Sequence, residues 1–456
     1  MNKKITVLDG ARDSDKNLDP ILTLLINVLQ HQYKAETKVF PLRNIKINPC
    51  IGCFSCWLKT PGRCVHRDAV PDILQEILDS DTVIFFTPIV FGGYSSELKK
   101  IGDRFLPMVL PFFKIAHGET HHLLRYSTMP HIAGIGVHPA PDKNQSECFR
   151  ILVGRNALNL SSDHSAEVIN STTDSPEKIR DKFNSLLSRT DKPPLGNTLF
   201  SLAYNSTASI QKVPIGKRKV LLITGSQKAN TSTSAVLGEY FLKILEKHNI
   251  ETESLDLKET LIHCEQQRSL CRAVAKADII LLAAPLYFDA LPFLVTKAFE
   301  TIASHCSNVR NSPKIFFVLL NSGLPESYQN SAALSICRNF ASEMNMTWAG
   351  GLTIGAGEAL ISGRSLTGFT GFRGLVKRPP LFYVTRALKD AASALAEGYP
   401  IPERVVHTLA EKTPVPLLSF NAWRYLLIKM SNRLLKKEVV KNGLSIQKVF
   451  DKPYAD

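Results

Sequence analysis

The stretch Lys4–Gly10 (KITVLDG) near the start of the chain has a counterpart in Lys219–Gly225 (KVLLITG). Each is an apolar run that ends in glycine and is followed by a stretch with helical periodicity. A second pair recurs further along, because Asp81–Pro88 (DTVIFFTP) matches Asp278–Pro285 (DIILLAAP) in spacing and character. A repeat of this length predicts two tandem domains of one kind.

The apolar runs in both copies are continuous rather than alternating, which indicates parallel strands buried on both faces of a sheet. Helical periodicity between the runs makes the predicted fold class α/β, with a doubly wound, flavodoxin-like sheet of five parallel strands in each copy. In the second copy, strands are predicted near residues 219–224, 251–256, 278–284, 314–320 and 346–354. Helices are predicted near residues 231–248, 266–276, 291–304 and 328–343.

The domain boundaries follow from changes in composition. We predict a first domain over residues 1–190, a linker over 191–216, a second domain over 217–370 and a basic helical C-terminal extension over 371–456. Pro193, Pro194 and Gly196, with several Ser and Thr, mark the linker. The first copy is longer between its matching runs by about the length of segment 49–66, which is therefore predicted to be an insert.

Composition and charge argue against several classes of function. The net charge is +14, but residues 371–456 carry much of it, and no nucleic-acid-binding motif accompanies the charge, so we expect no nucleic-acid partner. The longest apolar stretches fall far short of the roughly 18 residues that span a bilayer, so no integral membrane segment is expected. The first residues lack an apolar leader. The nine cysteines, four of them close together, fit a reduced, cytoplasmic location.

Residues 420–440 combine apolar and basic side chains at helical spacing. Such a helix can lie on an anionic membrane or pack its apolar side on its own domain. Packing is the favoured interpretation, because no lipidation signal supplies a second membrane anchor.

The loops after the first and third strands are the candidate binding sites, since an open parallel sheet binds ligands at the carboxyl ends of its strands. In the second copy, a hydroxyl-rich loop follows the first strand and opens a helix, a combination that suits a phosphate group. The candidate phosphate ligands are Ser226, Lys228, Asn230, Thr231, Ser232 and Thr233. The alternative is a plain helix N-cap with spare serines.

The loop after the third strand is apolar and aromatic, which suits packing against a flat ring. The candidate ring-contacting residues are Pro285, Leu286, Tyr287 and Phe288 in the second copy and Pro88, Ile89, Val90, Phe91 and Gly92 in the first. Together the two loops predict a mononucleotide with an aromatic head.

Residues 49–64 (PCIGCFSCWLKTPGRC) and 87–99 (TPIVFGGYSSELK), with Asp68, Asp103 and Arg104, resemble the NAD(P)H-dependent FMN reductase and iron–sulfur flavoprotein family of flavodoxin-like proteins. The second copy looks like a cysteine-poor member of the same family. The resemblance implies FMN as cofactor, NAD(P)H as electron donor and a homo-oligomer. It also places the FMN phosphate on the first loop and the isoalloxazine ring on the proline-led loop.

The first copy departs from the family pattern in its phosphate loop, Asp9–Asn17 (DGARDSDKN). Ala11 stands where the family has a hydroxyl, and Asp9, Asp13 and Asp15 would repel a phosphate. We therefore expect FMN in the second copy. The first copy is then either a structural relic or part of a ligand site shared across an interface.

Four cysteines share the compact spacing C-x2-C-x2-C-x7-C, namely Cys50, Cys53, Cys56 and Cys64. In the resembled iron–sulfur flavoproteins a run of this kind holds a [4Fe–4S] cluster, which implies the same ligand here. A four-thiolate zinc site and a metal-free thiol loop are the alternatives that the spacing leaves open. Cys264 and Cys271 have no predicted partner and are expected to be idle or buried thiols.

The predicted function is a flavin-dependent oxidoreductase that passes electrons from NAD(P)H or an iron–sulfur partner through FMN to a small-molecule acceptor. Hydride transfer requires no acid–base side chain at this level, so no catalytic residue is predicted. The alternative is a non-catalytic redox or metal sensor built on a degenerate flavodoxin-like scaffold.

Overall fold

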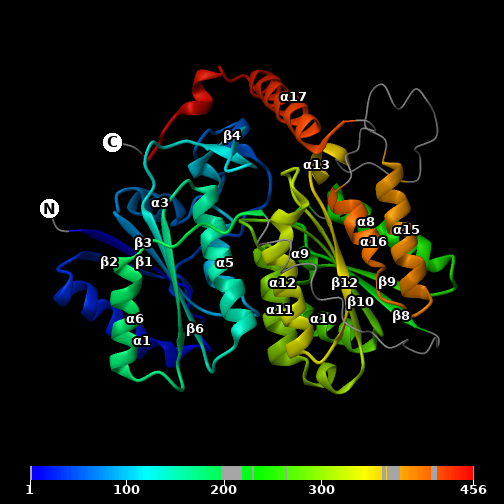
Figure 1. The fold of residues 1–456 in the computed structure, drawn as a ribbon, viewed down its shortest axis with the longest axis horizontal. Helices are drawn as coiled ribbons and strands as arrows, with labels where there is room; N and C mark the ends of the chain where they lie inside the picture. The colour runs from blue at the N-terminus through cyan, green and yellow to red at the C-terminus, as the bar shows by residue number, and fades with distance from the viewer. Residues whose placement is uncertain are drawn as a thin grey trace. The chain divides into compact units, whose positions relative to one another are not determined.

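The computed structural model describes residues 3–196, 218–228, 231–261, 264–361, 366, 381–411 and 418–454 (Figure 1). The chain divides into two compact units, one formed by Met1–Leu195 with Ser431–Asp456 and the other by Gly196–Met430. Most of the predicted linker lies outside the described residues.

The first unit is built on a five-stranded parallel sheet in the order β2-β1-β3-β6-β7. Its strands are β1 (Lys4–Asp9), β2 (Glu36–Pro41), β3 (Thr82–Pro88), β6 (His131–His138) and β7 (His164–Asn170). Its longer helices are α1 (Asp19–Asn27), α3 (Val70–Leu78), α4 (Ser96–Gly102), α5 (Lys143–Asn159) and α6 (Pro176–Ser188). Apolar side chains of α1 and α6 pack together on one face of the sheet, against Val7 and Phe86.

The second unit has a parallel sheet in the order β12-β11-β10-β8-β9. Its strands are β8 (Lys219–Thr224), β9 (Glu251–Asp256), β10 (Ile279–Pro285), β11 (Ile315–Asn321) and β12 (Thr347–Ile354). The helices between them are α8 (Thr233–Glu246), α9 (Leu257–Thr260), α10 (Cys264–Lys276), α11 (Phe293–His305) and α12 (Ser331–Glu343), and α13 (Gly357–Leu360) follows β12. Counted along the chain, both sheets have the strand order 2-1-3-4-5, so the prediction of two flavodoxin-like sheets is confirmed.

The two units repeat each other down to single hydrogen bonds. The Asp81 carboxylate accepts the backbone N–H of Lys4 at 2.8 Å, and the Asp278 carboxylate accepts the N–H of Lys219 at 2.8 Å. These matched contacts tie the start of the first strand to the start of the third strand in each unit. They also show which loops of the two units correspond.

The first unit carries two insertions that have no counterpart among the described residues of the second. The predicted insert follows β2 and contains the short helix α2 (Ser55–Leu58). An antiparallel hairpin, β4 (Val109–Ala116) and β5 (Glu119–Leu124), follows α4 and was not predicted. Its two strands pair with each other in a small sheet of their own, separate from the central sheet.

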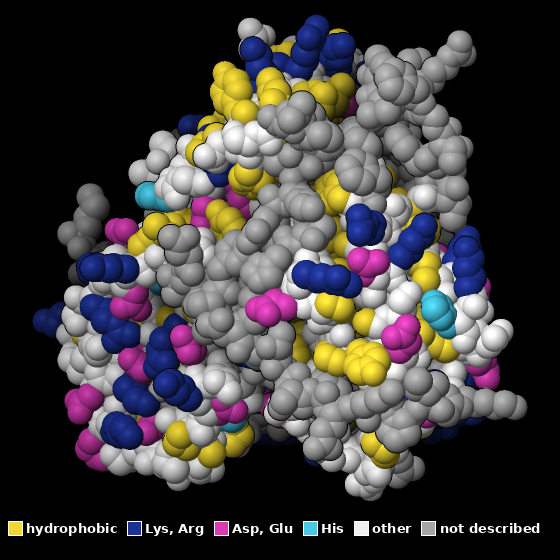
Figure 2. All heavy atoms as spheres, turned by 45° about the vertical axis from the view of Figure 1, so that its right-hand side comes forward, with side chains coloured by type: hydrophobic (Ala, Val, Ile, Leu, Met, Phe, Trp, Pro, Cys, Tyr) yellow, Lys and Arg dark blue, Asp and Glu magenta, His cyan; other side chains and the backbone are white. Residues whose placement is uncertain are grey.

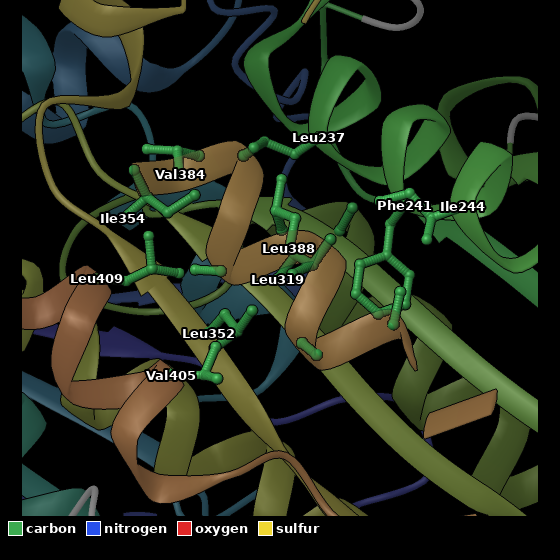
Figure 3. Close-up of a cluster of buried hydrophobic side chains, with 14 of the residues drawn as sticks. Leu237, Phe241, Ile244, Leu319, Leu352, Ile354, Val384, Leu388, Val405 and Leu409 are labelled. Atoms are coloured by element: carbon green, nitrogen blue, oxygen red, sulfur yellow. The ribbon is translucent and has the colours of Figure 1, made fainter. Parts of the chain in front are cut away.

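Part of the predicted C-terminal extension belongs to the core of the second unit. Helices α15 (Phe382–Ala396) and α16 (Glu403–Glu411) pack with α8 against one face of the sheet. Figure 3 shows Val384 and Leu388 of α15 beside Leu237 of α8. Helix α15 thus covers the sheet beside α8 as α6 does beside α1. The second unit therefore extends past the predicted boundary at residue 370, as far as Met430. The long stretch of sequence between β12 and α15 conceals from the sequence that α15 belongs to this unit.

Helix α17 (Phe420–Lys441) is shared between the two units. Trp423 and Leu427 pack in the second unit's core, whereas Val439 packs in a small apolar cluster of the first unit. Other apolar side chains of α17 are about half exposed, namely Tyr425, Leu426, Met430 and Leu434. Figure 2 shows hydrophobic and Lys or Arg side chains together at the top, where Figure 1 places this helix. No helix among the described residues is both long and apolar enough to cross a membrane.

The prediction that Cys271 is an idle thiol is wrong. Cys271 of α10 forms a disulfide with Cys306, which follows α11, and the two Cα atoms are 5.4 Å apart. The two cysteines are 35 residues apart in sequence, and they meet because α10 and α11 pack side by side. Spacing along the sequence does not reveal this packing. The side chain of Cys264 lies outside the described residues.

We expect Leu388→Ala to lower the free energy of unfolding of the second unit by about 2–5 kcal/mol, because Leu388 is fully buried and truncation leaves a cavity. Urea unfolding followed by amide-hydrogen exchange in second-unit peptides measures the change. Lys389→Ala, at the exposed neighbouring position of α15, is the matched control. Equal stability of the two variants would contradict a core role for α15.

Candidate functional site

In the loop after β1 of the first unit, a buried aspartate binds the arginine of the same loop. Asp15 is buried, and its carboxylate accepts the backbone N–H of Arg12 at 2.9 Å and the Arg12 Nε at 2.7 Å. Burial alone would raise the pKa of Asp15, but the hydrogen bonds from Arg12 outweigh it and lower that pKa. An N–H and a cation that a phosphate would need are thus already bound to a carboxylate. This loop does not fit a phosphate.

The equivalent loop of the second unit has no Asp or Glu between Ser226 and Thr233. The Ser226 hydroxyl accepts the N–H of Lys228 at 3.2 Å, and Ser232 caps α8 by accepting the N–H of Ala235 at 3.1 Å. The Thr233 hydroxyl is buried and has no hydrogen-bond partner within the part of the chain that the structure describes. A buried polar atom without a partner is costly, so this loop fits a ligand that supplies acceptor oxygens at the α8 N-terminus.

The remaining predicted phosphate ligands have local partners or lie outside the structure. Lys228 Nζ pairs with Glu358 of α13 at 3.1 Å. The Thr231 hydroxyl donates to the Lys228 carbonyl at 2.9 Å. Asn230 lies outside the described residues. Ser226, Ser232 and Thr233 are therefore the predicted residues that the geometry places best for a phosphate.

The glycine that ends each repeated run is explained by a helix that packs closely against it. A Cβ atom at Gly225 would lie 2.2 Å from a methyl carbon of Val295 in α11. In the first unit a Cβ at Gly10 would lie 2.7 Å from the Cβ of Leu98 in α4. The helix after the third strand approaches the end of the first strand so closely that a larger residue would displace it.

The proline-led loops have the same shape in both units. Residues 90–93 and 287–290 each close a two-residue turn with reciprocal backbone hydrogen bonds. The central residues of both turns have φ between 48° and 88°, as in the turns that connect tight hairpins. In the second unit these are Phe288 and Asp289, for which positive φ costs roughly 1 kcal/mol or more each. Strain of this kind concentrates at ligand sites.

The two proline-led loops differ in how exposed their residues are to solvent. All four predicted ring-contacting residues of the second unit are half-buried, namely Pro285, Leu286, Tyr287 and Phe288. In the first unit, Pro88 through Gly92 are buried throughout. The second unit therefore combines the open ring loop with the phosphate loop that has an unpartnered donor.

Asn321 is a site residue that the sequence analysis did not single out. It ends β11, and its Nδ2 donates to the Ser234 hydroxyl at 2.7 Å and to the Ala284 carbonyl at 3.2 Å. It thereby joins the phosphate-loop helix to the strand that precedes the ring loop. The signal in the sequence was an amide residue placed directly after a run of apolar residues.

The four cysteines of the insert are free thiols with different exposure. Cys56 is buried, Cys50 and Cys64 are half-buried, and Cys53 is exposed. Burial raises the pKa of Cys50 to about 12, and Cys64 and Cys53 add to the rise. Burial also raises the pKa of Cys56, with contributions from the other three. The thiols are thus close enough to interact, although no three potential metal ligands are grouped together within the described ranges.

Two buried arginines beside these cysteines have unused hydrogen-bond donors. Arg104 is 1% exposed and Arg125 is 3% exposed. Nε and Nη2 of Arg104 and Nη2 of Arg125 have no hydrogen-bond partner among the residues described. Burial raises the pKa of Cys56, and the charge of Arg125 opposes that rise. Buried guanidinium N–H groups without a partner suit an anionic occupant, and four thiolates around an iron–sulfur cluster or a zinc ion carry net negative charge.

An ion pair holds the two ends of the cysteine insert together. Arg104 Nη1 donates to the Asn48 carbonyl at 3.0 Å and forms a fully buried pair with Asp68. The Asp68 carboxylate also accepts the N–H of Asn48 at 2.9 Å. Burial alone would raise the pKa of Asp68, but these hydrogen bonds, that of Arg104 first, lower it.

Trp57 anchors the middle of the insert. Its Nε1 donates to the carbonyls of Leu106 at 3.2 Å and Val109 at 3.0 Å. Its ring stacks on Phe54 and contacts the ring of His122 in the hairpin. Burial lowers the pKa of His122 to about 4, so this ring is neutral at physiological pH. The unpredicted hairpin thus supports the cysteine insert.

We expect Asp68→Asn to lower the free energy of unfolding of the first unit at pH 7 by about 3–5 kcal/mol, because it leaves the Arg104 charge buried and unpaired. The folded pKa of Asp68 lies below its unfolded value, so the pair stabilises the fold above about pH 4 and this stabilisation is lost as the pH falls. Urea unfolding between pH 3 and pH 7 should therefore show the variant and the wild type converging in acid. Asp72→Asn, at an exposed position of α3, is the control; a constant difference across pH would contradict the assignment.

The family assignment rests on comparisons with known proteins. Residues 3–121 and 218–352, more than half of the chain, match the family of NADPH-dependent FMN reductases. An iron–sulfur flavoprotein of Methanocaldococcus jannaschii is 31% identical over 109 residues, which are 24% of this chain and 55% of that protein. An iron–sulfur flavoprotein of Archaeoglobus fulgidus is 37% identical over 108 residues, 23% of this chain and 46% of that protein. The chain thus spans about half the length of the curated relatives it matches.

Among the solved structures that resemble part of the chain is the NAD(P)H:quinone oxidoreductase from Methanothermobacter marburgensis. It is 14% identical, with a TM-score of 0.27, and the likeness covers 40% of this chain and 96% of that one. A likeness this low does not bear on activity. Each of the two matched segments begins at the first strand of one repeated sheet, so the chain belongs to the NADPH-dependent FMN reductase family, with two tandem copies of its fold.

Proposed function

We propose that the chain is a flavin-dependent oxidoreductase that holds FMN in its second unit. In this proposal it takes electrons from NAD(P)H or an iron–sulfur partner and passes them to a small-molecule acceptor. The observation that carries the proposal is the buried, unpartnered hydroxyl of Thr233 at the N-terminus of α8, in a loop free of carboxylates. The matching loop of the first unit, closed by Asp15, supports the same choice.

The roles of the protein's residues follow from their positions. Ser226, Ser232 and Thr233 would bind the phosphate together with the free N–H groups of α8. Tyr287 and Phe288 would cover the flat ring and exclude water from it. When bound, FMN supplies the redox chemistry, because its ring accepts a hydride and releases electrons. The protein's own contribution is binding, orientation and exclusion of solvent.

We further propose a [4Fe–4S] cluster as the ligand of Cys50, Cys53, Cys56 and Cys64. Four thiols in one short insert supply the donor set, and the unused N–H groups of Arg125 and of Arg104, which is already paired with Asp68, would donate to it. Binding would have to draw the four sulfur atoms together. A zinc ion would use the same donors, so metal analysis decides between them.

A second candidate function is a redox or metal sensor without catalysis. The observation that favours it is confined to the first unit, where the phosphate loop is closed by Asp15 and the ring loop is buried. If the second unit also purified without flavin and had no affinity for added FMN, the sensor would be the better description. Bound flavin absorbance therefore separates the two functions.

We expect the wild-type chain to bind a single FMN and Ser226→Asp to bind it roughly tenfold more weakly or worse, because of like-charge repulsion. An Asp side chain can still accept the Lys228 N–H, so the loop should keep its shape. Flavin fluorescence titration gives the Kd, and released FMN per chain gives the stoichiometry. Ala11→Ser, a hydroxyl added to the first unit's loop, is the control and should change neither. Binding of FMN by the first unit instead would contradict the assignment.

We expect replacement of any one of the four insert cysteines by Ser to remove most of the iron and acid-labile sulfide, because a stable cube needs all four thiolates. FMN content should stay unchanged. Cys148→Ala, which removes another free cysteine of the same unit, is the control. Iron, zinc and sulfide are measured after anaerobic purification and reconstitution. Protein that contains neither metal in proportion to chain would rule out the cluster.

A further inference from the structure

Residues 449–454 are the last that the structure describes. They pack against parts of the first unit that are far from them in sequence. Val449 is fully buried in an apolar cluster with Leu110 and Phe112 of the hairpin. Tyr454 is 6% exposed, and its N–H donates to the Tyr126 hydroxyl at 3.3 Å. Residues 449–454 are therefore held at this surface of the first unit.

This C-terminal segment, residues 449–454, contacts the cysteine insert at Gly62. A Cβ at Gly62 would lie 2.6 Å from Cδ of Pro453, and Gly62 has φ +76°, which favours glycine. The Gly62 N–H donates to the Cys56 carbonyl at 2.9 Å. Pro453 thus packs on the turn that joins Cys56 to Cys64.

Arg125 connects the C-terminal segment to Cys56. Its Nε donates to the Pro107 carbonyl at 2.7 Å, and its Nη1 donates to the carbonyls of Val449 at 2.5 Å and Asp451 at 2.8 Å. These bonds fix the guanidinium plane and leave Nη2 without a partner among the residues described. The charge of Arg125 reaches the Cys56 thiol, where it opposes the effect of burial on the pKa.

Tyr454 lies close to two of the four cysteines. Burial raises its pKa, Arg63 opposes the rise, and Cys64 and Cys56 add to it. The Arg63 guanidinium lies 6.0 Å from the centre of the Tyr454 ring. The aromatic side chain thus lies beside Arg63, the residue that precedes Cys64 in the insert.

We propose that the C-terminal segment completes the wall of the cysteine site and limits the access of solvent and oxidants to Cys56 and Cys64. Tyr454 and Pro453 form the cover, and Arg125 is the positioning residue that holds them to the hairpin. The contacts belong to the first unit alone. The inference therefore does not depend on flavin binding or on the identity of a metal.

The test compares thiol reactivity in reduced, metal-free protein. A chain truncated after Asp451 lacks Pro453 and Tyr454 but keeps both carbonyls bound by Arg125, and Tyr454→Ala removes only the side chain. Lys452→Ala, at an exposed position of the same segment, is the matched control. Iodoacetamide labelling, resolved by cysteine with mass spectrometry, gives a rate for each thiol.

We expect Cys56 and Cys64 to react roughly tenfold faster in both cover variants, while Cys53, already exposed, stays within about twofold of its wild-type rate. Cys148 and Cys337 are buried cysteines outside any disulfide and report unfolding, so they should stay unlabelled. Wild-type rates at Cys56 and Cys64 in Tyr454→Ala would overturn the proposal. If the truncated chain also labels Cys148, Tyr454→Ala decides by the same criterion.

A second measurement applies when the site is loaded. If reconstitution yields iron, the cover variants should lose it in air several-fold faster than the wild type and Lys452→Ala. A failure to load iron would count against the cluster, but it would leave the thiol measurement valid.

Discussion

Burial of the central strands on both faces is the constraint on which the rest of each unit depends. In β3 and β10 the runs Val83–Phe86 and Ile279–Ala284 are almost wholly out of water. Since neither face of these strands can carry unpaired polar groups, binding groups are confined to the strand ends. Parallel pairing brings the carboxyl ends of successive strands to one edge. The chemistry of each unit therefore lies in loops that the sheet positions without fixing their sequence.

The two units show how far such loops diverge on one frame. Both keep the Asp–Lys contact between the first and third strands, the glycine under the next helix and the tight turn after the proline. Yet in one candidate phosphate loop Asp15 binds the cation and an N–H group, whereas in the other the Thr233 hydroxyl has no partner among the residues that the structure describes. The difference is electrostatic rather than architectural. We infer that the frame was retained for packing in the first unit and for ligand binding in the second.

The cysteine insert is too small to bury its own side chains, so its surroundings come from elsewhere in the chain. Arg104 follows α4, Trp57 rests on the hairpin, and Arg125 joins the hairpin to the C-terminal segment. Each of these supports is a hydrogen bond between a buried side chain and a backbone carbonyl. Together they hold the thiol-rich loop against the rest of the first unit.

The sequence by itself determined the repeat, the parallel sheets, the strand order and the loops where binding groups gather. It could do so because continuous apolar runs and their spacing report burial locally. Only the tertiary structure decided the hairpin, the place of α15 in the second core, the Cys271–Cys306 bond and the contact of Tyr454 with Arg63 of the insert. Each joins segments far apart in the chain. Such contacts depend on which surfaces pack together, and a linear pattern of hydrophobic and polar residues carries no record of that.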